Sequence, residues 1–225
     1  KELGIEFVSS TAQELNYHPK YNGSKEELGR KLRRYFFEKL AHEYQAQAIA
    51  LAHHADDQIE TFFIRLLRGR SISGIAGMRA QDGWYVRPLL KWHKSDILNY
   101  LKKENVSYLL DSTNLEENFL RNRIRLNLLP MLSTIDARWP KTIPSCIAQL
   151  QQTDIFLDKH CQKIMLEISD PNNQNHINIQ RFLELDEILQ HRIILILLIN
   201  QKTQFTPTTA LFHEILRFLR SNQSN

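Results

Sequence analysis

The chain has 225 residues, enough for one full domain and a smaller one. Its 42% hydrophobic and 24% charged residues are typical of a globular protein, and no apolar run approaches the ~20 residues of a membrane span. The only two cysteines, Cys146 and Cys161, are far apart, which excludes a disulfide framework or redox pair and indicates a reducing compartment. We therefore expect a cytoplasmic protein with no membrane partner; the oligomeric state is left open.

The net charge of +4 is concentrated in one part of the chain. Residues 135–225 carry nine basic and nine acidic residues, so the whole excess lies in residues 1–134. Residues 65–94 hold seven basic residues, one acid and three aromatic residues. This stretch suits the binding of phosphates or bases, and it is equally compatible with a solvated basic face. Composition does not choose between these interpretations.

The first part of the chain alternates between predicted strands and helices. Short apolar runs predict strands at Ile5–Ser9, Ala48–Ala52 and Val106–Leu109. Helical periodicity predicts helices at Lys25–Tyr44, Asp56–Leu67, Lys94–Glu104 and Glu117–Leu129, the last ending near Pro130. This alternation is typical of an α/β layer fold.

Local patterns add detail to these elements. Ser24 is a plausible N-cap of the first helix. The compact run Ala48–Ala52 suits a strand buried on both faces of a parallel sheet. The second helix carries an apolar stripe that we expect to face the core, formed by Ile59, Phe62, Phe63, Leu66 and Leu67.

The second part of the chain is expected to be helical. From about Ala137 onward the pattern is mostly that of helices, with a loop at 171–175. We therefore predict two domains, an α/β domain over residues 1–134 and a helical one over residues 135–225. The chain starts without an initiator Met and its first residues resemble the middle of a domain, so we also expect an N-terminal truncation.

The run Ala52-His-His-Ala-Asp-Asp-Gln-Ile-Glu-Thr61 lies where a buried strand should end and a helix begin. Ligands of open α/β sheets bind at the carboxyl ends of strands, which makes His53 a candidate site residue. Asp57 and Glu60 share one helical face, where two carboxylates can hold Mg²⁺ or orient a polar substrate. Acids in a first turn also stabilise the helix dipole, and for Asp56 alone we favour this structural interpretation.

A second polar cluster follows at Asp111-Ser-Thr-Asn114 and Phe119-Leu-Arg-Asn-Arg-Ile-Arg125. Arg121 and Arg125 are four residues apart and form one cationic edge, whose guanidinium groups suit phosphate or a base edge. The structural alternative is pairing within the helix, with Glu117 reaching Arg121. Spacing alone does not decide between them.

Together these blocks resemble the bacterial tRNA(Ile)-lysidine synthases, members of the N-type ATP-pyrophosphatase superfamily. The matching runs are Ala52 to Thr61, Leu67-Arg-Gly-Arg-Ser-Ile-Ser-Gly-Ile-Ala-Gly-Met78, Arg87-Pro-Leu-Leu90, Asp111-Ser-Thr-Asn114, and Arg121-Asn-Arg-Ile-Arg125 with Leu129-Pro130. They occur in the family's order and spacing across about residues 24–132. The resemblance implies a partial Rossmann-like, adenine nucleotide alpha hydrolase-like parallel sheet followed by the smaller helical domain.

The resemblance also implies a reaction. ATP adenylates the C2 oxygen of the wobble cytidine in the CAU anticodon of an isoleucine tRNA; the ε-amine of free L-lysine then attacks C2, and AMP leaves. The implied catalytic residues are His53, Asp57, Glu60, Arg121 and Arg125, with Asp57 and Glu60 as ligands of Mg²⁺. The implied nucleotide contacts are Arg30 and Asn114, and the implied RNA contacts are Arg68, Arg87, Arg121 and Arg125.

The sequence departs from the family pattern in three places. The family's Ser-Gly-Gly-x-Asp-Ser loop, which holds pyrophosphate, occurs nowhere in the 225 residues, so we expect this chain alone to be inactive. The run Gly29-Arg-Lys-Leu-Arg-Arg-Tyr35 has one residue more than the family's arginine motif, so either Arg30 with Arg33 or Lys31 with Arg34 is the counterpart. The glycine-rich loop carries Arg70-Ser71 where many members have Ser-Gly.

Two other functions remain open. One is a sulfur-transferring tRNA ATP-pyrophosphatase, although Cys146 and Cys161 form no Cys-x-x-Cys pair. The other is a non-enzymatic RNA-binding remnant.

Overall fold

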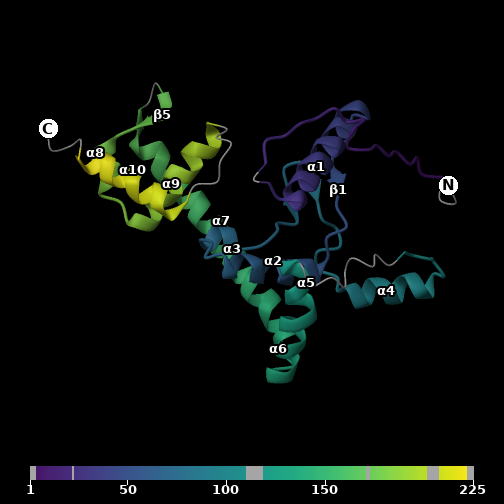
Figure 1. The fold of residues 1–225 in the computed structure, drawn as a ribbon. Coiled ribbons are helices and arrows are strands. Elements are labelled where there is room, and N and C mark those ends of the chain that lie inside the picture. Colours follow the sequence, from purple (N-terminus) through teal and green to yellow (C-terminus); the bar gives the residue numbers. More distant parts are fainter. Residues whose placement is uncertain (1–3, 22, 110–118, 171–172, 202–207, 222–225) are drawn as a thin grey trace. The chain divides into compact units, whose positions relative to one another are not determined.

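The computed structural model describes residues 4–21, 23–109, 119–170, 173–201 and 208–221 (Figure 1). Its contacts form two compact units. The first comprises Lys1–Thr61 and Met78–Leu128, and the second Phe62–Gly77 and Leu129–Asn225. The predicted division into two domains at residue 134 stays a prediction, because the two units are defined only by contacts within the chain.

A small three-stranded sheet organises the first unit. Its strands are β1 (Ile49–Ala50), β2 (Gln81–Asp82) and β3 (Tyr85–Val86), in the order β1-β3-β2. β1 pairs with β3 in parallel, with Ile49 opposite Tyr85, whereas β2 pairs with β3 antiparallel. A parallel pair requires a long crossover, and here the chain between the two strands contains a helix. The predicted α/β class is therefore confirmed.

Helices make up most of the first unit's regular structure. They are α1 (Lys25–Glu43), the first part of α2 (Ala55–Leu67), α4 (Lys94–Lys103), α5 (Leu120–Arg123) and the π-helical turn η2 (Ile124–Leu128). The predicted helices that begin near residues 25, 56 and 94 are confirmed within one residue at each end. The position of Ser24 as N-cap is also confirmed, although its side chain makes no capping hydrogen bond.

Several finer predictions for this part of the chain are wrong. Ile5–Ser9 and Val106–Leu109 form no strand, because neither segment pairs with another strand among the described residues. The strand at β1 spans two residues and Ala50 is exposed, so it is not buried on both faces. Leu66 and Leu67, at the end of the expected apolar stripe, are also exposed, whereas Ile59 is fully buried.

The predicted end of a helix near Pro130 is also wrong. Pro130 is the second residue of α6 (Leu129–Ile135), which directly follows η2. Proline is tolerated in the first turn of a helix, where its missing N–H is not required. The wider π-turn before it breaks the regular α-helical hydrogen bonding, so Pro130 stands at a new helix start rather than a helix end.

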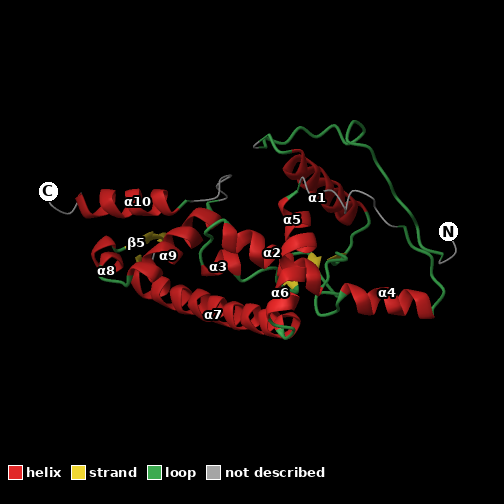
Figure 2. Ribbon diagram, turned by 60° about the horizontal axis from the view of Figure 1, so that its bottom comes forward, coloured by secondary structure: helices red, strands yellow, loops and turns green. Residues whose placement is uncertain are grey.

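The second unit is almost entirely helical (Figure 2). It contains α3 (Ile72–Ile75), α6, α7 (Trp139–Ile168), α8 (Ile179–Leu183), α9 (Glu187–Asn200), α10 (Thr209–Ser221) and the hairpin β4 (Ser169–Asp170) with β5 (Asn173–Ile177). This confirms the helical prediction for residues 137 onward. The loop predicted at 171–175 is partly wrong, since residues 173–175 belong to β5. No helix among the described residues is both long and apolar enough to cross a membrane.

The core of the second unit lies between α7, α8, α9 and α10. Its buried members are Cys161, Ile168, Phe182, Ile193, Ile194 and Leu216. The buried side chain of Gln190 donates to the backbone oxygens of Phe182, Leu183 and Leu185. A buried amide thus satisfies carbonyls at the end of α8, which a helix end leaves without partners.

Candidate functional site

The candidate site lies in the first unit, at the carboxyl ends of the parallel strands β1 and β3. The pairing continues past the strand ends, because the amide of Leu51 donates to the carbonyl of Val86 at 2.8 Å. His53 follows β1, and Arg87 follows β3 directly. Carboxyl ends of parallel strands meet at one edge of a sheet, where ligands of α/β proteins bind. The structure therefore brings these two predicted residues to a common edge.

A capping box fixes Asp57 at the start of α2. The amide of His54 donates to Asp57 Oδ2 at 3.0 Å, and the amide of Asp57 donates to His54 Nδ1 at 3.4 Å. These reciprocal bonds satisfy N–H groups that the helix start leaves unpaired. Asp57 thus has a structural role whatever else it does, and its charge acts on the neighbouring His53.

Asp56 connects the start of α2 to the start of α4. Its Oδ1 lies 2.9 Å from His93 Nδ1, and its Oδ2 accepts the amide of Lys94 at 2.8 Å. The amide of Ala55 donates to the carbonyl of Trp92 at 2.9 Å. These bonds join the starts of α2 and α4, in agreement with the structural interpretation of Asp56.

Glu60 is the centre of a buried ion cluster. Its side chain is 1% exposed and accepts two hydrogen bonds from Arg125, Nε to Oε1 at 2.6 Å and Nη2 to Oε2 at 3.2 Å. Arg121 Nε lies 3.0 Å from Glu60 Oε2, and Arg121 Nη2 donates to Thr61 Oγ1 at 3.3 Å. The hydrogen bond to Glu60 raises the pKa of Arg125. Arginine side chains are not deprotonated in proteins, so both guanidinium groups carry a positive charge. Within this trio one carboxylate faces two guanidinium groups, leaving an excess of one positive charge.

This geometry bears on the predicted magnesium site. Mg²⁺ requires carboxylate oxygens that are available for coordination. Both oxygens of Glu60 are engaged by guanidinium groups, and a divalent cation there would be repelled by them. The residues present therefore do not fit direct coordination by Glu60. Asp57 is the remaining predicted ligand, and its oxygen Oδ2 already accepts the amide of His54.

Three buried nitrogen atoms at the site have no hydrogen-bond partner among the described residues. They are His53 Nδ1, Arg87 Nε and Arg121 Nε, the last of which is close to Glu60 Oε2 as an ion pair without hydrogen-bond geometry. Arg87 is held in place by its Nη1, which donates to the carbonyl of Arg79 at 2.8 Å. Buried polar groups are nearly always hydrogen-bonded, so unpaired ones that converge at a strand edge indicate a ligand position.

The electrostatics of the site keep His53 neutral near pH 7. Burial lowers its pKa, and the positive charges of Arg87 and Arg121 lower it further, against the opposing effect of Asp57. A neutral imidazole can accept a proton, which is the property a general base requires. Asp57, Arg87 and Arg121 thus all act on the charge state of His53.

The arginine motif of α1 is resolved in part by its contacts. Lys31 Nζ donates to the carbonyl of Lys20 and lies 3.4 Å from Glu27. Arg34 Nε donates to Glu38 at 2.9 Å, and its guanidinium lies 5.1 Å from the centre of the Tyr85 ring. Both members of the pair Lys31 with Arg34 are therefore engaged locally.

The other pair makes fewer side-chain contacts, although Arg33 Nε donates to the carbonyl of Gly29 at 3.4 Å. Arg30 is exposed, and Arg33 lines a cavity of about 390 Å³ between α1 and residues 10–15. This favours Arg30 with Arg33 as the pair available to a ligand. Among the described residues, Arg30 makes no polar contact with His53 or the arginines of η2 and α5, so the structure does not join it to that cluster.

The remaining predicted residues lie elsewhere. Asn114, with the run 111–114, lies outside the described residues. Arg68 is exposed just after α2 and belongs to the second unit. The glycine-rich loop that follows is held by Arg65, whose Nη1 donates to the carbonyls of Gly74 and Gly77, at 2.9 Å each.

Sequence analysis missed two positioning residues, Arg65 and Gln58. Gln58 is buried in α2, donates to the carbonyl of Met78 at 2.8 Å and accepts its amide at 2.7 Å. The sequence could have indicated Gln58, because it is a polar residue next to Ile59 in a helix that we expected to face the core. A buried amide needs partners, and the exposed backbone of a glycine-rich loop offers them.

The comparisons with known proteins agree with this α/β architecture. The chain belongs to the PP-loop domain family, whose model matches residues 1–132. It is similar to proteins named tRNA(Ile)-lysidine synthase. One from Bacteroides thetaiotaomicron is 40% identical over 136 residues, covering 60% of this chain and 32% of the relative.

Two further relatives carry the same name. The Bacillus licheniformis protein is 30% identical over 222 residues, covering 96% of this chain and 46% of the relative. The Bacillus subtilis protein is 32% identical over 202 residues, covering 87% of this chain and 43% of the relative. The chain thus spans between a third and a half of the length of these three relatives.

Proposed function

We propose that this chain is part of an enzyme that uses ATP to attach free L-lysine to C2 of the wobble cytidine in the CAU anticodon of tRNA(Ile). The carrying observation is the strand-edge cluster, where His53 Nδ1 and Arg87 Nε are buried without partners beside the cationic pair on α5 and η2. The names of the relatives support a tRNA-modifying reaction at such a site.

The proposed reaction has two steps. The C2 oxygen of cytosine attacks the α-phosphorus of ATP, and diphosphate leaves. The ε-amine of lysine then attacks C2, and AMP leaves with the original C2 oxygen. The first product needs cations around its phosphate, and the lysine ammonium must lose a proton before it can attack.

The residues of the cluster suit these needs. Arg121 and Arg87 supply positive charge for the phosphate of the adenylated base or the tRNA backbone. His53 accepts the proton of the lysine ammonium, since its lowered pKa keeps it neutral. Glu60 orients Arg125 beside the base and is a positioning residue. Arg30, with Arg33, contacts the nucleotide, and Arg68 contacts RNA.

Magnesium and the domain roles belong to the same proposal. When ATP is bound, Mg²⁺ would neutralise the charge of its phosphates. Its proposed ligands are Asp57 and the phosphates, and Glu60 is not among them.

Residues 1–134 form the catalytic domain with its partial Rossmann-like sheet, and residues 135–225 form a tRNA-contacting helical domain. Sulfur transfer is disfavoured, because Cys161 is fully buried and burial raises the pKa of its thiol.

The test is incorporation of labelled lysine into a tRNA(Ile) transcript with a CAU anticodon, measured with the complete gene product. His53→Asn should lower the rate at least about 100-fold, the usual size of a lost general base. Arg87→Ala should lower it by roughly 100-fold, because a positive charge that stabilises the phosphate is lost. Arg34→Ala is the matched control, because Arg34 is an exposed arginine of α1 that pairs with Glu38. It should keep the full rate.

The outcomes separate the alternatives. Full lysine incorporation in His53→Asn and Arg87→Ala would refute the site. If the wild-type protein binds the tRNA but incorporates no lysine and consumes no ATP, the RNA-binding remnant is the better description.

A further inference from the structure

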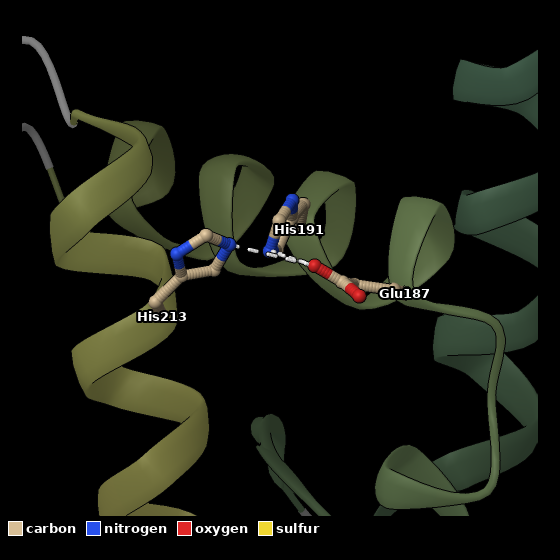
Figure 3. Close-up of side chains that lie close together, drawn as sticks. All are labelled: Glu187, His191 and His213. Carbon is tan, nitrogen blue, oxygen red and sulfur yellow. Dashed lines mark ion pairs between the residues drawn. The ribbon is translucent and has the colours of Figure 1, made fainter.

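A second group of potential ligands lies in the second unit. Glu187 and His191 are four residues apart on α9, and His213 is on α10. Figure 3 shows the three side chains pointing toward one another from the two helices. Each offers one ligand atom, and no two of these atoms are more than 4.8 Å apart. Nothing in the proposed tRNA reaction uses these residues.

The spacing of Glu187 from each histidine matches a tetrahedral site. Glu187 Oε1 lies 3.4 Å from His191 Nε2 and 3.6 Å from His213 Nε2. Zinc bonds to nitrogen and carboxylate oxygen are about 2.0–2.2 Å long, so neighbouring ligand atoms of a tetrahedral ion lie roughly 3.3–3.6 Å apart. The ligand atoms of the two histidines lie within 4.8 Å of each other, and rotation of the exposed His213 side chain can adjust that distance to an ion.

The position of His191 adds an independent observation. Its Nε2 is buried and has no hydrogen bond of acceptable geometry among the described residues. Its ring stacks on Phe212, with the ring centres 5.1 Å apart, and this contact holds the imidazole in place. The nitrogen therefore faces Glu187 and His213 without a hydrogen bond. Buried polar atoms nearly always have a partner, so this nitrogen is available to a ligand such as a metal ion.

The donor set indicates the class of ion. Two imidazoles and one carboxylate suit zinc and other late first-row divalent ions, whereas Mg²⁺ and Ca²⁺ prefer oxygen ligands. Three protein ligands leave a fourth position for water, and the exposure of Glu187 and His213 keeps it open to solvent.

We propose that Glu187, His191 and His213 form a zinc-type divalent metal site that fastens α10 to α9. The apolar side of α10 already packs through Leu216 into the core of the second unit. A metal bridge adds a polar fastening near the other end of the contact, beside Phe212. Because the ion binds only when the two helices are together, it stabilises the folded state.

The experiment is titration of the 225-residue chain, freed of metal, with Zn²⁺, followed by calorimetry and thermal unfolding. We expect one Zn²⁺ that raises the Tm by about 5–10 °C at roughly a hundredfold excess over Kd, whereas Mg²⁺ has no such effect. His213→Gln and Glu187→Gln should weaken Zn²⁺ binding at least about 100-fold, since even loss of an outer-shell partner costs roughly 10- to 100-fold.

Matched controls separate this site from other histidines. His160→Gln removes an exposed histidine of α7 that stacks on Phe156, and Glu214→Gln removes the acid next to His213. Both variants should bind Zn²⁺ as the wild type does. Co²⁺ should give the intense visible bands of a tetrahedral site in the wild type and lose them in His213→Gln.

Three results would overturn the proposal. One is wild-type Zn²⁺ affinity in His213→Gln, which would mean that other residues hold the ion. Another is failure of the folded wild-type chain to bind Zn²⁺. The third is equal loss of binding in His160→Gln. Unfolding in the presence of chelator shows whether each variant is folded, because His213 is exposed and its replacement should leave the metal-free Tm unchanged.

Discussion

The two units each contain a buried cluster of charged side chains, and the two clusters have opposite composition. In the first unit one carboxylate, Glu60, is shared by two arginines that are 36% and 26% exposed. In the second unit one arginine, Arg192, is 8% exposed and shared by Asp154 and Asp158. Arg192 also donates to Ser73 at 2.8 Å and to the backbone oxygen of Asp154 at 3.0 Å.

The difference separates a structural cluster from a functional one. Arg192 makes hydrogen bonds in several directions and has little surface left for a ligand. In the trio around Glu60 the arginines outnumber the carboxylate. The excess positive charge therefore lies on two side chains that are partly exposed to solvent. A buried centre with exposed cations can receive an anion, whereas a buried cation among carboxylates mainly holds helices together.

The largest expected effect tests the structural cluster. Arg192→Ala should lower the free energy of unfolding by about 3–5 kcal/mol, since it leaves a buried aspartate without its partner. Urea unfolding of the 225-residue chain is the measurement. Arg217→Ala is the control, because Arg217 is exposed and lies 3.9 Å from Glu214; its loss should cost about 0–1 kcal/mol. Similar values for both variants would contradict the comparison.

A smaller effect is expected at the centre of the other cluster. Glu60→Gln should lower the free energy of unfolding by about 1–3 kcal/mol, because two guanidinium groups lose a charged hydrogen-bond acceptor. Arg121→Ala should cost less, since that side chain is partly exposed and Arg125 still pairs with Glu60. Urea unfolding decides the order, and a larger loss in Arg121→Ala than in Glu60→Gln would reverse our assignment of Glu60 as the centre.

The pH response of His53 sharpens the comparison further. Its folded-state pKa is lowered by burial and by Arg87 and Arg121, so it should titrate below the ordinary value of about 6.5. The unfolded chain then binds the proton more readily, and this contribution to stability is present above about pH 6.5 and lost as the pH falls. NMR titration of the imidazole is the measurement.

The Arg121→Ala variant provides the control for that titration. Removing a positive charge should move the midpoint of His53 upward. An unchanged midpoint for His53 would show that Arg121 does not act on it.

The smallest expected effect concerns RNA binding. Arg87→Ala and Arg121→Ala should each lower the slope of log affinity against log salt by roughly 0.7–0.9, if each contacts one phosphate. Arg125→Ala should leave the slope nearly unchanged and weaken the preference for a CAU anticodon. Arg34→Ala is the control, since Arg34 pairs with Glu38. Filter binding of tRNA at several salt concentrations tests all four, and equal slopes throughout would contradict the assignment of phosphate contacts.

Prediction from the sequence was most reliable for long periodic helices. α1, α2 and α4 were located within one residue because their apolar spacing and end signals agree. The short runs at residues 5–9 and 106–109 failed, because a strand depends on a partner that the local sequence does not specify. The interruption at η2 was missed for a similar reason, since no residue in Ile124–Leu128 marks a π-turn.

The sequence singled out candidate site residues but not the contacts that they make. His53, Asp57, Glu60, Arg87, Arg121 and Arg125 were all singled out, and the structure brings them to one part of the first unit. The roles of Asp57 in a capping box and of Glu60 between two arginines were not predicted. Spacing of three residues places two carboxylates on one face, but it does not say which groups arrive from elsewhere in the chain.

The sequence by itself determined the α/β class, the main helices, the location of the basic excess and the resemblance to a family. Each of these depends on local periodicity or on residues in a fixed order. Only the tertiary structure decided which acid is capped, which is shared by arginines, and which histidines of α9 and α10 meet. Those outcomes depend on contacts between residues as far apart as 60 and 125, or 191 and 213, whose distance is set by packing rather than by their spacing along the chain.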